Sequence, residues 1–263
     1  MDLGIKGKNA LVAASSKGLG RAVAEELAAE GANLVMCARS AEDLDKTSRE
    51  ITANTGVKVL AVPTDLTDSS AVENLLDRAH KEVGNIDILV TNTGGPPPGP
   101  FESHSSDAWA TAVHQNLYSV LNLTRGVLPS MLESGWGRIV NITSVAVKEP
   151  VDGLILSNSI RAAVTGFAKT LANEVAGKGV TVNNVMPGFT MTDRLESLAK
   201  SRSELSGSTV DEVFSSMAQT IPMQRIGTPR EFAALVGFLA SERASYITGV
   251  SIPVDGGVVK GLI

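Results

Sequence analysis

The sequence predicts an α/β protein built on a doubly wound, parallel sheet of seven strands with helices on both faces. Short apolar runs alternate with longer amphipathic stretches along the 263 residues, which is the order produced by right-handed strand–helix–strand crossovers. The apolar runs are continuous rather than interrupted at every second residue, as expected of strands covered on both faces. No linker and no internal repeat interrupts this order, so residues 1–263 are predicted to form a single domain.

The strands and helices follow from the hydrophobic pattern and its stop signals. The strands are predicted at residues 9–14, 33–37, 57–62, 86–91, 139–143, 180–185 and 250–254. The helices are predicted from the glycine turn to Gly31, over 41–54, from the Asp65–Asp68 cap to about Val83, and over 105–132, 156–176 and 229–240.

Residues 191–222 break the alternation with a long, polar and helix-like stretch. A long excursion beside strand ends is often functional, so we interpret this stretch as a substrate lid. A surface insertion without a function is the alternative.

Composition and charge exclude several classes of protein. The net charge of −5 gives no basic footprint for nucleic acid. Cys37 is the single cysteine, so an internal disulfide and a cysteine metal cluster are excluded, and we expect no metal site. Neither a signal-peptide pattern nor an apolar run of about 18 residues is present, which favours a cytoplasmic protein without membrane contact.

A glycine-rich turn follows the first predicted strand and opens the first helix, the arrangement that begins a Rossmann-type nucleotide-binding fold. Backbone amides at a helix N-terminus attract phosphate, and glycines let the backbone approach it closely. The turn consists of Ser15, Ser16, Lys17, Gly18, Leu19 and Gly20. Two glycines alone are a weak signal, but their place after the first strand predicts a phosphate site.

The end of the second predicted strand selects between two forms of a dinucleotide. An acidic residue there would bind a ribose 2′-hydroxyl, whereas Arg39 suits a 2′-phosphate. Lys17 adds positive charge at the same corner. We therefore expect NADP(H) to be favoured over NAD(H); the alternative is that both are solvated surface residues.

These motifs resemble the short-chain dehydrogenase/reductase family over nearly the whole chain, and most closely its 3-oxoacyl-acyl-carrier-protein reductases. The T-G-x-x-x-G-x-G turn of the family falls on Ala13–Gly20, so its first glycine is Ala14 here. The C-terminal D-G-G is Asp255–Gly257. Beyond the turn and Arg39, the resemblance implies cofactor contacts from Asp65, Leu66, Asn92, Gly94, Arg161, Pro187, Gly188, Thr190 and Thr192.

The catalytic set that the resemblance implies is only partly retained. Asn116 and Ser144 match the helix asparagine and the serine, but the Y-x-x-x-K motif falls on Ser157 and Arg161. The chain thus resembles a divergent subgroup with an altered glycine turn and an altered Tyr/Lys pair. The family also implies self-association to a dimer or homotetramer through the 162–176 helix.

The altered pair changes the expected proton chemistry. A serine hydroxyl is a far weaker acid than the tyrosine that it replaces, and Arg161 stays charged and cannot relay a proton. Binding is therefore expected to persist while proton transfer is impaired, by roughly 10²–10⁴ in rate. Glu149 is the best spare acid–base candidate, with a solvated loop charge as its alternative.

Three hypotheses follow for the function. The first is an NADP-dependent oxidoreductase that acts on a carbonyl or alcohol, possibly of the 3-oxoacyl type, in which Ser144 and Asn116 polarise the oxygen and Ser157 or a water handles the proton. The second is a nucleotide-binding protein without redox activity. The third is a non-redox lyase on the same scaffold. The retained cofactor residues favour the first.

Overall fold

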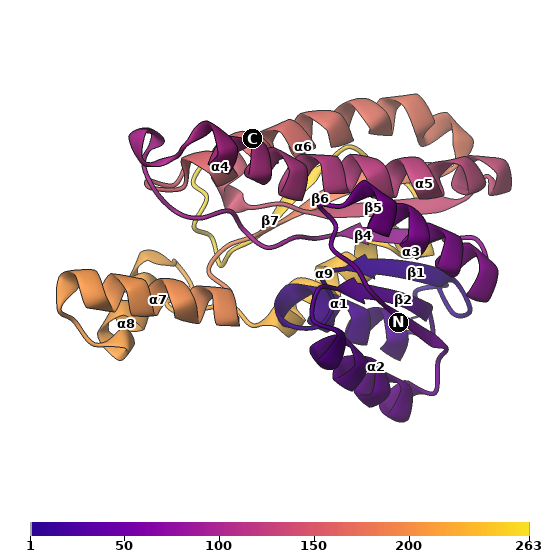
Figure 1. Cartoon of the computed structure of the whole chain (residues 1–263), viewed down its shortest axis with the longest axis horizontal. Helices are drawn as coiled ribbons and strands as arrows, with labels where there is room; N and C mark the ends of the chain where they lie inside the picture. Colours follow the sequence, from indigo (N-terminus) through magenta and orange to yellow (C-terminus); the bar gives the residue numbers. More distant parts are fainter. Residues whose placement is uncertain (1, 263) are drawn as a thin grey trace.

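A single parallel sheet of seven strands organises the structure, a computed structural model that describes residues 2–262 (Figure 1). The strands are β1 Asn9–Ala13, β2 Asn33–Ala38, β3 Val59–Pro63, β4 Ile88–Thr91, β5 Gly137–Ile142, β6 Val180–Pro187 and β7 Ser251–Val254. Their order across the sheet is β3-β2-β1-β4-β5-β6-β7, and every neighbouring pair is parallel. The predicted fold class is confirmed.

Helices cover both faces of this sheet, as predicted. They are α1 Gly18–Ala29, α2 Ala41–Thr55, α3 Ser69–Glu82, α4 Ser106–Val113, α5 Ser119–Ser134, α6 Ile155–Val175, α7 Asp193–Ser206, α8 Val210–Thr220 and α9 Pro229–Leu239, with short 3-10 turns at Phe101–Ser103, Val145–Val147, Ala176–Lys178 and Glu242–Ala244. One apolar core joins the sheet to α1, α2 and α9, and the other joins it to α3, α5 and α6. The two cores lie on opposite sides of the sheet (Figure 1).

The helix predicted over 105–132 is interrupted, which the sequence pattern did not indicate. A π-helical segment, His114–Tyr118, separates α4 from α5. Such a segment inserts an extra residue into the helical turn and is frequent at functional sites. It lies where Asn116 was expected to serve catalysis.

The excursion beyond β6 forms a helical pair with a small core of its own. Helices α7 and α8 pack through Leu195, Ala199, Val213 and Met217. In Figure 1 the pair (orange) stands to one side of the sheet layers. The helical character predicted for 191–222 is present, and a separate core lets this pair be displaced without disturbing the two main cores.

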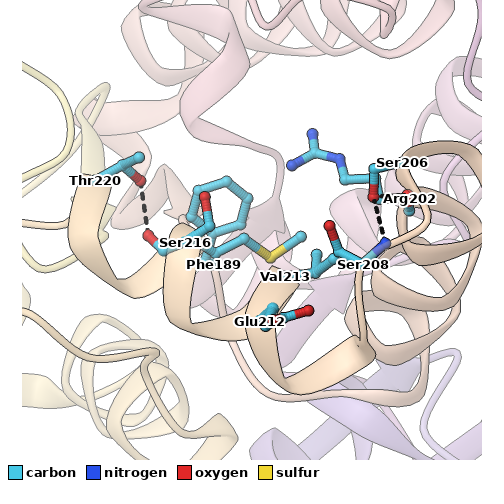
Figure 2. A pocket seen from close by; sticks show the side chains of 9 residues that line it. Phe189, Arg202, Ser206, Ser208, Glu212, Val213, Ser216 and Thr220 are labelled. Carbon is cyan, nitrogen blue, oxygen red and sulfur yellow. Dashed lines mark hydrogen bonds between the residues drawn. The ribbon is translucent and has the colours of Figure 1, made fainter.

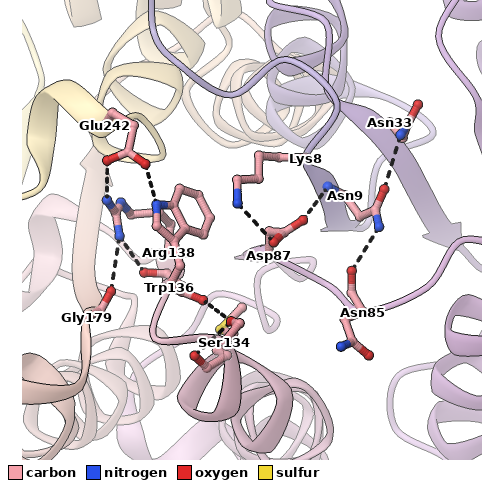
Figure 3. Close-up of polar contacts among 12 residues, drawn as sticks. Lys8, Asn9, Asn33, Asn85, Asp87, Ser134, Trp136, Arg138, Gly179 and Glu242 are labelled. Atoms are coloured by element: carbon pink, nitrogen blue, oxygen red, sulfur yellow. Dashed lines mark hydrogen bonds and ion pairs between the residues drawn. The ribbon is translucent and has the colours of Figure 1, made fainter.

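A polar cluster around Trp136 lies at the edge of the sheet where the parallel strands begin (Figure 3). The Trp136 ring lies between the Lys8 ammonium, 4.0 Å from the ring centroid, and the Arg138 guanidinium, 4.3 Å away. Arg138 is buried and pairs with Glu242 at 3.4 Å, and Lys8 pairs with Asp87 at 3.4 Å. A buried cation needs such a partner. The cluster is structural, because it lies at the edge opposite the strand ends that carry the predicted site.

Candidate active site

A cleft of about 1080 Å³ runs along the carboxyl ends of the strands. This is where ligands bind in open α/β sheets, because strand order reverses between β1 and β4. Most of the residues predicted for the site line it: Ser16, Lys17, Gly18, Leu19, Arg39, Asp65, Leu66, Asn92, Gly94, Ser144, Ser157, Arg161, Pro187, Gly188, Thr190 and Thr192. The sheet thus gathers residues from seven segments far apart in sequence.

Three residues assigned to the site lie outside the cleft lining within residues 2–262: Ser15, Gly20 and Asn116. Ser15 is buried, and its amide donates to the Cys37 carbonyl at 3.0 Å. A Cβ at Gly20 would lie 2.2 Å from the Ala14 carbonyl oxygen. Ser15 and Gly20 therefore shape the turn rather than contact a ligand.

The Asn116 amide is directed into the protein and not into the cleft. Asn116 is 2 % exposed, its Oδ1 accepts from Thr93 Oγ1 at 2.8 Å, and its Nδ2 donates to the Ala112 carbonyl at 3.2 Å. With both ends of the amide occupied, the side chain is not placed to polarise a substrate carbonyl. Asn116 instead joins the π-helical segment to Thr93, which lines the cleft next to Asn92.

The first glycine position of the family motif has a left-handed backbone here, although Ala14 occupies it. Ala14 has φ +49° and Gly18 has φ +59°, both in the left-handed region. An alanine adopts this conformation at a cost of roughly 1–2 kcal/mol. Position 14 thus departs from the family motif in its residue, while its backbone has the left-handed angle that glycine adopts most readily.

The turn offers an open helix N-terminus to an anion. Lys17 is the N-cap of α1, and within the described chain no side chain caps this helix and its first turn carries no acid. Its first amides are thus free to donate to a phosphate, and the helix dipole favours negative charge there.

Positive charge flanks the turn on two sides. Arg39 is exposed and lies near Asp65. Hydrogen bonds from Thr67 lower the pKa of the Asp65 carboxyl, and the Arg39 charge acts in the same direction. Lys17 forms an exposed ion pair with Asp193 of α7 at 3.5 Å, a type of pair that contributes little stability. Lys17 therefore also connects the turn to the α7–α8 pair.

The catalytic end of the cleft holds Ser144, Ser157 and Arg161. Ser144 Oγ accepts from the Ala146 amide at 3.1 Å, and Ser157 Oγ makes no hydrogen bond within residues 2–262. Arg161 Nη1 donates to the carbonyl of Ile142 at 2.9 Å. Burial lowers the pKa of the Arg161 guanidinium to about 10, and the charge of Arg194 acts in the same direction. The group therefore remains a cation at neutral pH.

Glu149 does not serve the cleft. Its Oε1 accepts from the backbone amides of Lys260 at 2.7 Å and Gly261 at 3.1 Å. The expectation of a spare acid–base group at this position is thus corrected: the carboxylate fastens the C-terminal segment. Two titratable side chains near Asn116, Tyr118 and His114, stack on each other with ring centroids 5.0 Å apart. Neither lines the cleft of the described chain.

Arg194 is a cleft residue that the sequence did not single out. It lies in the first turn of α7, and its Nη2 donates to the Pro96 carbonyl at 3.0 Å. This contact joins α7 to the Gly94–Pro100 loop, whose residues line one side of the cleft. The sequence could have indicated Arg194 through its position, because it lies two residues after Thr192 at the start of the predicted lid.

A second cavity, of about 500 Å³, lies within the α7–α8 pair (Figure 2). Phe189, Arg202 and Met217 line both this cavity and the cleft. Figure 2 shows Arg202 and Phe189 on the cavity wall, with the Ser208 amide donating to Ser206 Oγ at its rim. The cavity of the helical pair therefore adjoins the cleft.

Comparison with known proteins identifies the family. A family model described as "Enoyl-(Acyl carrier protein) reductase" matches residues 13–259. The 3-oxoacyl-acyl-carrier-protein reductase of Haemophilus influenzae is 37% identical over 254 residues, which are 97% of this chain and 99% of that one. The chain belongs to the short-chain dehydrogenase/reductase family. The sequence-based resemblance is thereby confirmed.

Solved structures agree with this assignment. L-sorbose reductase from Gluconobacter frateurii, complexed with NADPH and L-sorbose, superposes with a TM-score of 0.95 at 33% identity over 100% of both chains. An actinorhodin polyketide ketoreductase with NADPH gives 0.93 at 32% identity over 97% of this chain and 98% of that one. Among residues 2–262, no helix has the length and apolarity to cross a membrane, and no cluster of three or more metal-ligating side chains is found.

The left-handed Ala14 generates a stability prediction. Ala14→Gly is expected to leave the free energy of unfolding unchanged or to raise it by up to about 1.5 kcal/mol. Relief of a strain of about 1–2 kcal/mol offsets the roughly 0.5–1 kcal/mol of added unfolded-chain entropy. Urea denaturation measures the change. Ala13→Gly, one residue earlier in β1, is the control and should destabilise; equal destabilisation by both would refute the argument.

Proposed function

We propose that this protein is an NADP(H)-dependent oxidoreductase that interconverts a carbonyl compound and an alcohol. One observation carries the proposal: a single cleft connects the open N-terminus of α1 and Arg39 to Ser144, Ser157 and Arg161. Relatives that are 3-oxoacyl-acyl-carrier-protein reductases, and reductase structures that contain NADPH, support it. A 3-oxoacyl compound is one substrate class within this proposal.

The residues present fit a phosphorylated dinucleotide. The diphosphate would lie on the free amides of α1, and Arg39 would hold the 2′-phosphate through charge-assisted hydrogen bonds. Asn92, Gly94 and the Pro187–Gly188 segment would border the cofactor further along the cleft. Thr190 and Thr192 would face the carboxamide; Thr190 Oγ1 now makes a long hydrogen bond of 3.3 Å to Gly188, which is readily exchanged.

Without the tyrosine and lysine of the family, fewer side chains are available to act on the substrate carbonyl. When bound, the nicotinamide supplies or accepts a hydride. Ser144 and Ser157 would donate hydrogen bonds to the substrate oxygen, and the Arg161 cation would stabilise negative charge that develops on it. The proton would come from water, because neither serine is acidic enough and Arg161 stays charged. We therefore expect slow turnover, since general acid catalysis is worth roughly 10²–10⁴ in rate.

We further propose that α7 and α8 act as a substrate lid on this single domain. Arg194, Leu195, Leu198, Arg202 and Met217 of this pair line the cleft. A lid that moves would exclude water from the reacting centre, which strengthens the electrostatic contacts there.

A non-redox role remains the second candidate, as a nucleotide-binding protein or a lyase. Two observations favour it: the tyrosine position holds Ser157, and the Asn116 amide is committed to Thr93 and Ala112. In this case the cofactor site would be retained while hydride transfer is absent.

The proposed function is tested by cofactor and substrate selection together. We expect NADPH to bind, and its absorbance to fall with a panel of ketones and 3-oxoacyl thioesters. Arg39→Ala should raise the Kd for NADPH by about tenfold, the effect of losing one charged hydrogen bond, and leave the Kd for NADH nearly unchanged. Arg49→Ala, an exposed arginine on α2, is the control. Equal weakening of both cofactors contradicts the NADP preference, and binding without turnover favours the non-redox role.

The altered pair gives a gain-of-function prediction. Ser157→Tyr with Arg161→Lys is expected to raise kcat on simple ketones by up to about 10²-fold, because it supplies an acid and a cation that can relay its proton. Ser157 lines the cleft, so the larger side chain would project into it. Ser157→Tyr alone should gain less. A double variant that folds, binds NADPH and shows no gain would refute this account of the missing step.

We also propose self-association to a dimer or tetramer through α6. Among the apolar residues of this helix, Val164, Leu171 and Val175 are buried within the chain, whereas Ala163 is exposed and Phe167 is half-buried. The remaining outer face of α6 carries small side chains, which would let a helix of a second subunit approach closely. Light scattering at micromolar concentration should show a dimer or tetramer; a monomer would end the proposal.

A further inference from the structure

The C-terminal segment, residues 255–261, follows β7 and contributes Val258 to the wall of the cleft. Val258 is half-buried. At the start of the segment, a Cβ on Gly188 would lie only 2.7 Å from the Cβ of Asp255. Because Gly188 is proposed to border the cofactor, the segment begins next to the proposed position of the cofactor.

Hydrogen bonds within the segment fix its path. Asp255 Oδ1 accepts from the amide of Gly257 at 2.9 Å, and its Oδ2 accepts from the amide of Val259 at 2.8 Å. The residues on either side of position 258 are therefore both bonded to one carboxylate. Chain ends are poorly ordered unless such contacts hold them, so the side chain at position 258 has a defined place in the cleft wall.

Glu149 holds the far end of the segment. Its Oε1 accepts from the amides of Lys260 at 2.7 Å and Gly261 at 3.1 Å, and Glu149 belongs to the loop that follows Ser144. Val258 precedes Lys260 by two residues, which span at most about 7 Å. Val258 is thus confined to the vicinity of the Ser144 loop, where the substrate carbonyl is proposed to bind.

The loop between Ser144 and α6 adds three more apolar side chains to the lining of the cleft: Val145, Val151 and Leu154. The Glu149 carboxylate, in the same loop, lines no part of the cleft within residues 2–262 and is bonded to the C-terminal segment instead. An apolar group next to the substrate carbonyl would leave water by packing against these side chains and Val258, which is favourable.

We propose that Val258 contacts an apolar group that the substrate carries next to its carbonyl, and that Glu149 is the positioning residue that holds Val258 there. This inference rests on the proposed function for the reaction itself. Within the described chain Glu149 forms no ion pair, so it acts as a hydrogen-bond acceptor for two amides and not as a charge partner. Its effect on the reaction passes through the segment that it holds.

The experiment compares a long and a short methyl ketone, octan-2-one and butan-2-one, with NADPH as the reductant. The measured quantity is the ratio of kcat/KM for the long ketone to kcat/KM for the short one. We expect Val258→Ala to lower this ratio roughly tenfold, as for the loss of apolar contact in a substrate pocket. Val259→Ala is the control and should leave the ratio unchanged, because Val259 does not line the cleft in the described chain.

The role of Glu149 is tested by the same ratio. Glu149→Ala should lower it to a similar extent, and Lys260→Pro, which removes one of the two donor amides, should act in the same direction. Glu149→Gln should keep the ratio close to that of the unsubstituted protein, since an amide oxygen can also accept two hydrogen bonds. Adding Val258→Ala to Glu149→Ala should cause little further loss, because both act through one contact. Glu174→Ala, at an exposed glutamate on α6, is the control.

Each other outcome has a defined meaning. A ratio that Val258→Ala does not change, or turnover of the short ketone alone, overturns this inference and leaves the proposed function standing. Losses from Glu149→Ala and Val258→Ala that simply add, or a loss from Glu149→Gln as large as that from Glu149→Ala, overturn the positioning role. Weaker NADPH binding by Val258→Ala, measured by calorimetry, assigns Val258 to the cofactor and also overturns the inference.

If no carbonyl compound is turned over, the proposed function fails, and calorimetry of the NADPH complex with the two ketones decides. Binding of the long ketone that Val258→Ala and Glu149→Ala both weaken supports the contact, and absence of binding overturns it.

Discussion

The parallel ladder that joins β1 to β4 and β4 to β5 is the constraint on which the site depends. It pairs Val12 with Val90 and Val90 with Val140, so the three strands end at one level. The chain then leaves each strand on the same side, as the glycine turn, the Asn92 segment and the Ser144 segment. Because the sheet is buried on both faces, register errors would disturb both cores. The placement of the cleft residues is therefore held by the whole fold.

Compared with the family motif, the site retains a cation at position 161 but has no acidic side chain at position 157. Arg161 replaces an amine with a group that cannot deliver its proton, and Ser157 replaces a phenol with an alcohol. What remains is well suited to binding and to electrostatic stabilisation: two serine hydroxyls, a buried guanidinium and a second guanidinium from α7. Such a site would depend more on charge complementarity with its substrate than on proton transfer.

Much of this could be predicted from the sequence, and the exceptions have physical causes. Strands, helices and most cleft residues follow from hydrophobic periodicity and from residues that directly follow strands. The π-helical segment and the inward amide of Asn116 could not be predicted, because they depend on hydrogen bonds to Thr93 and Ala112 across the tertiary structure. Glu149 was misjudged because its partners, the amides of Lys260 and Gly261, are more than 100 residues away. Arg194 was missed because the path of α7 toward Pro96 is set by tertiary packing.

In the turn between β1 and α1, the glycine positions of one motif are subject to different physical constraints. At position 14 the demand is a backbone angle, which alanine meets at a modest energetic cost. At position 20 it is a steric exclusion, since a Cβ would stand 2.2 Å from a carbonyl oxygen. Sequence drift can therefore pass through the first position and is blocked at the last. A search pattern that weights both glycines alike would reject this chain, whereas one that weights them by cost of replacement would retain it.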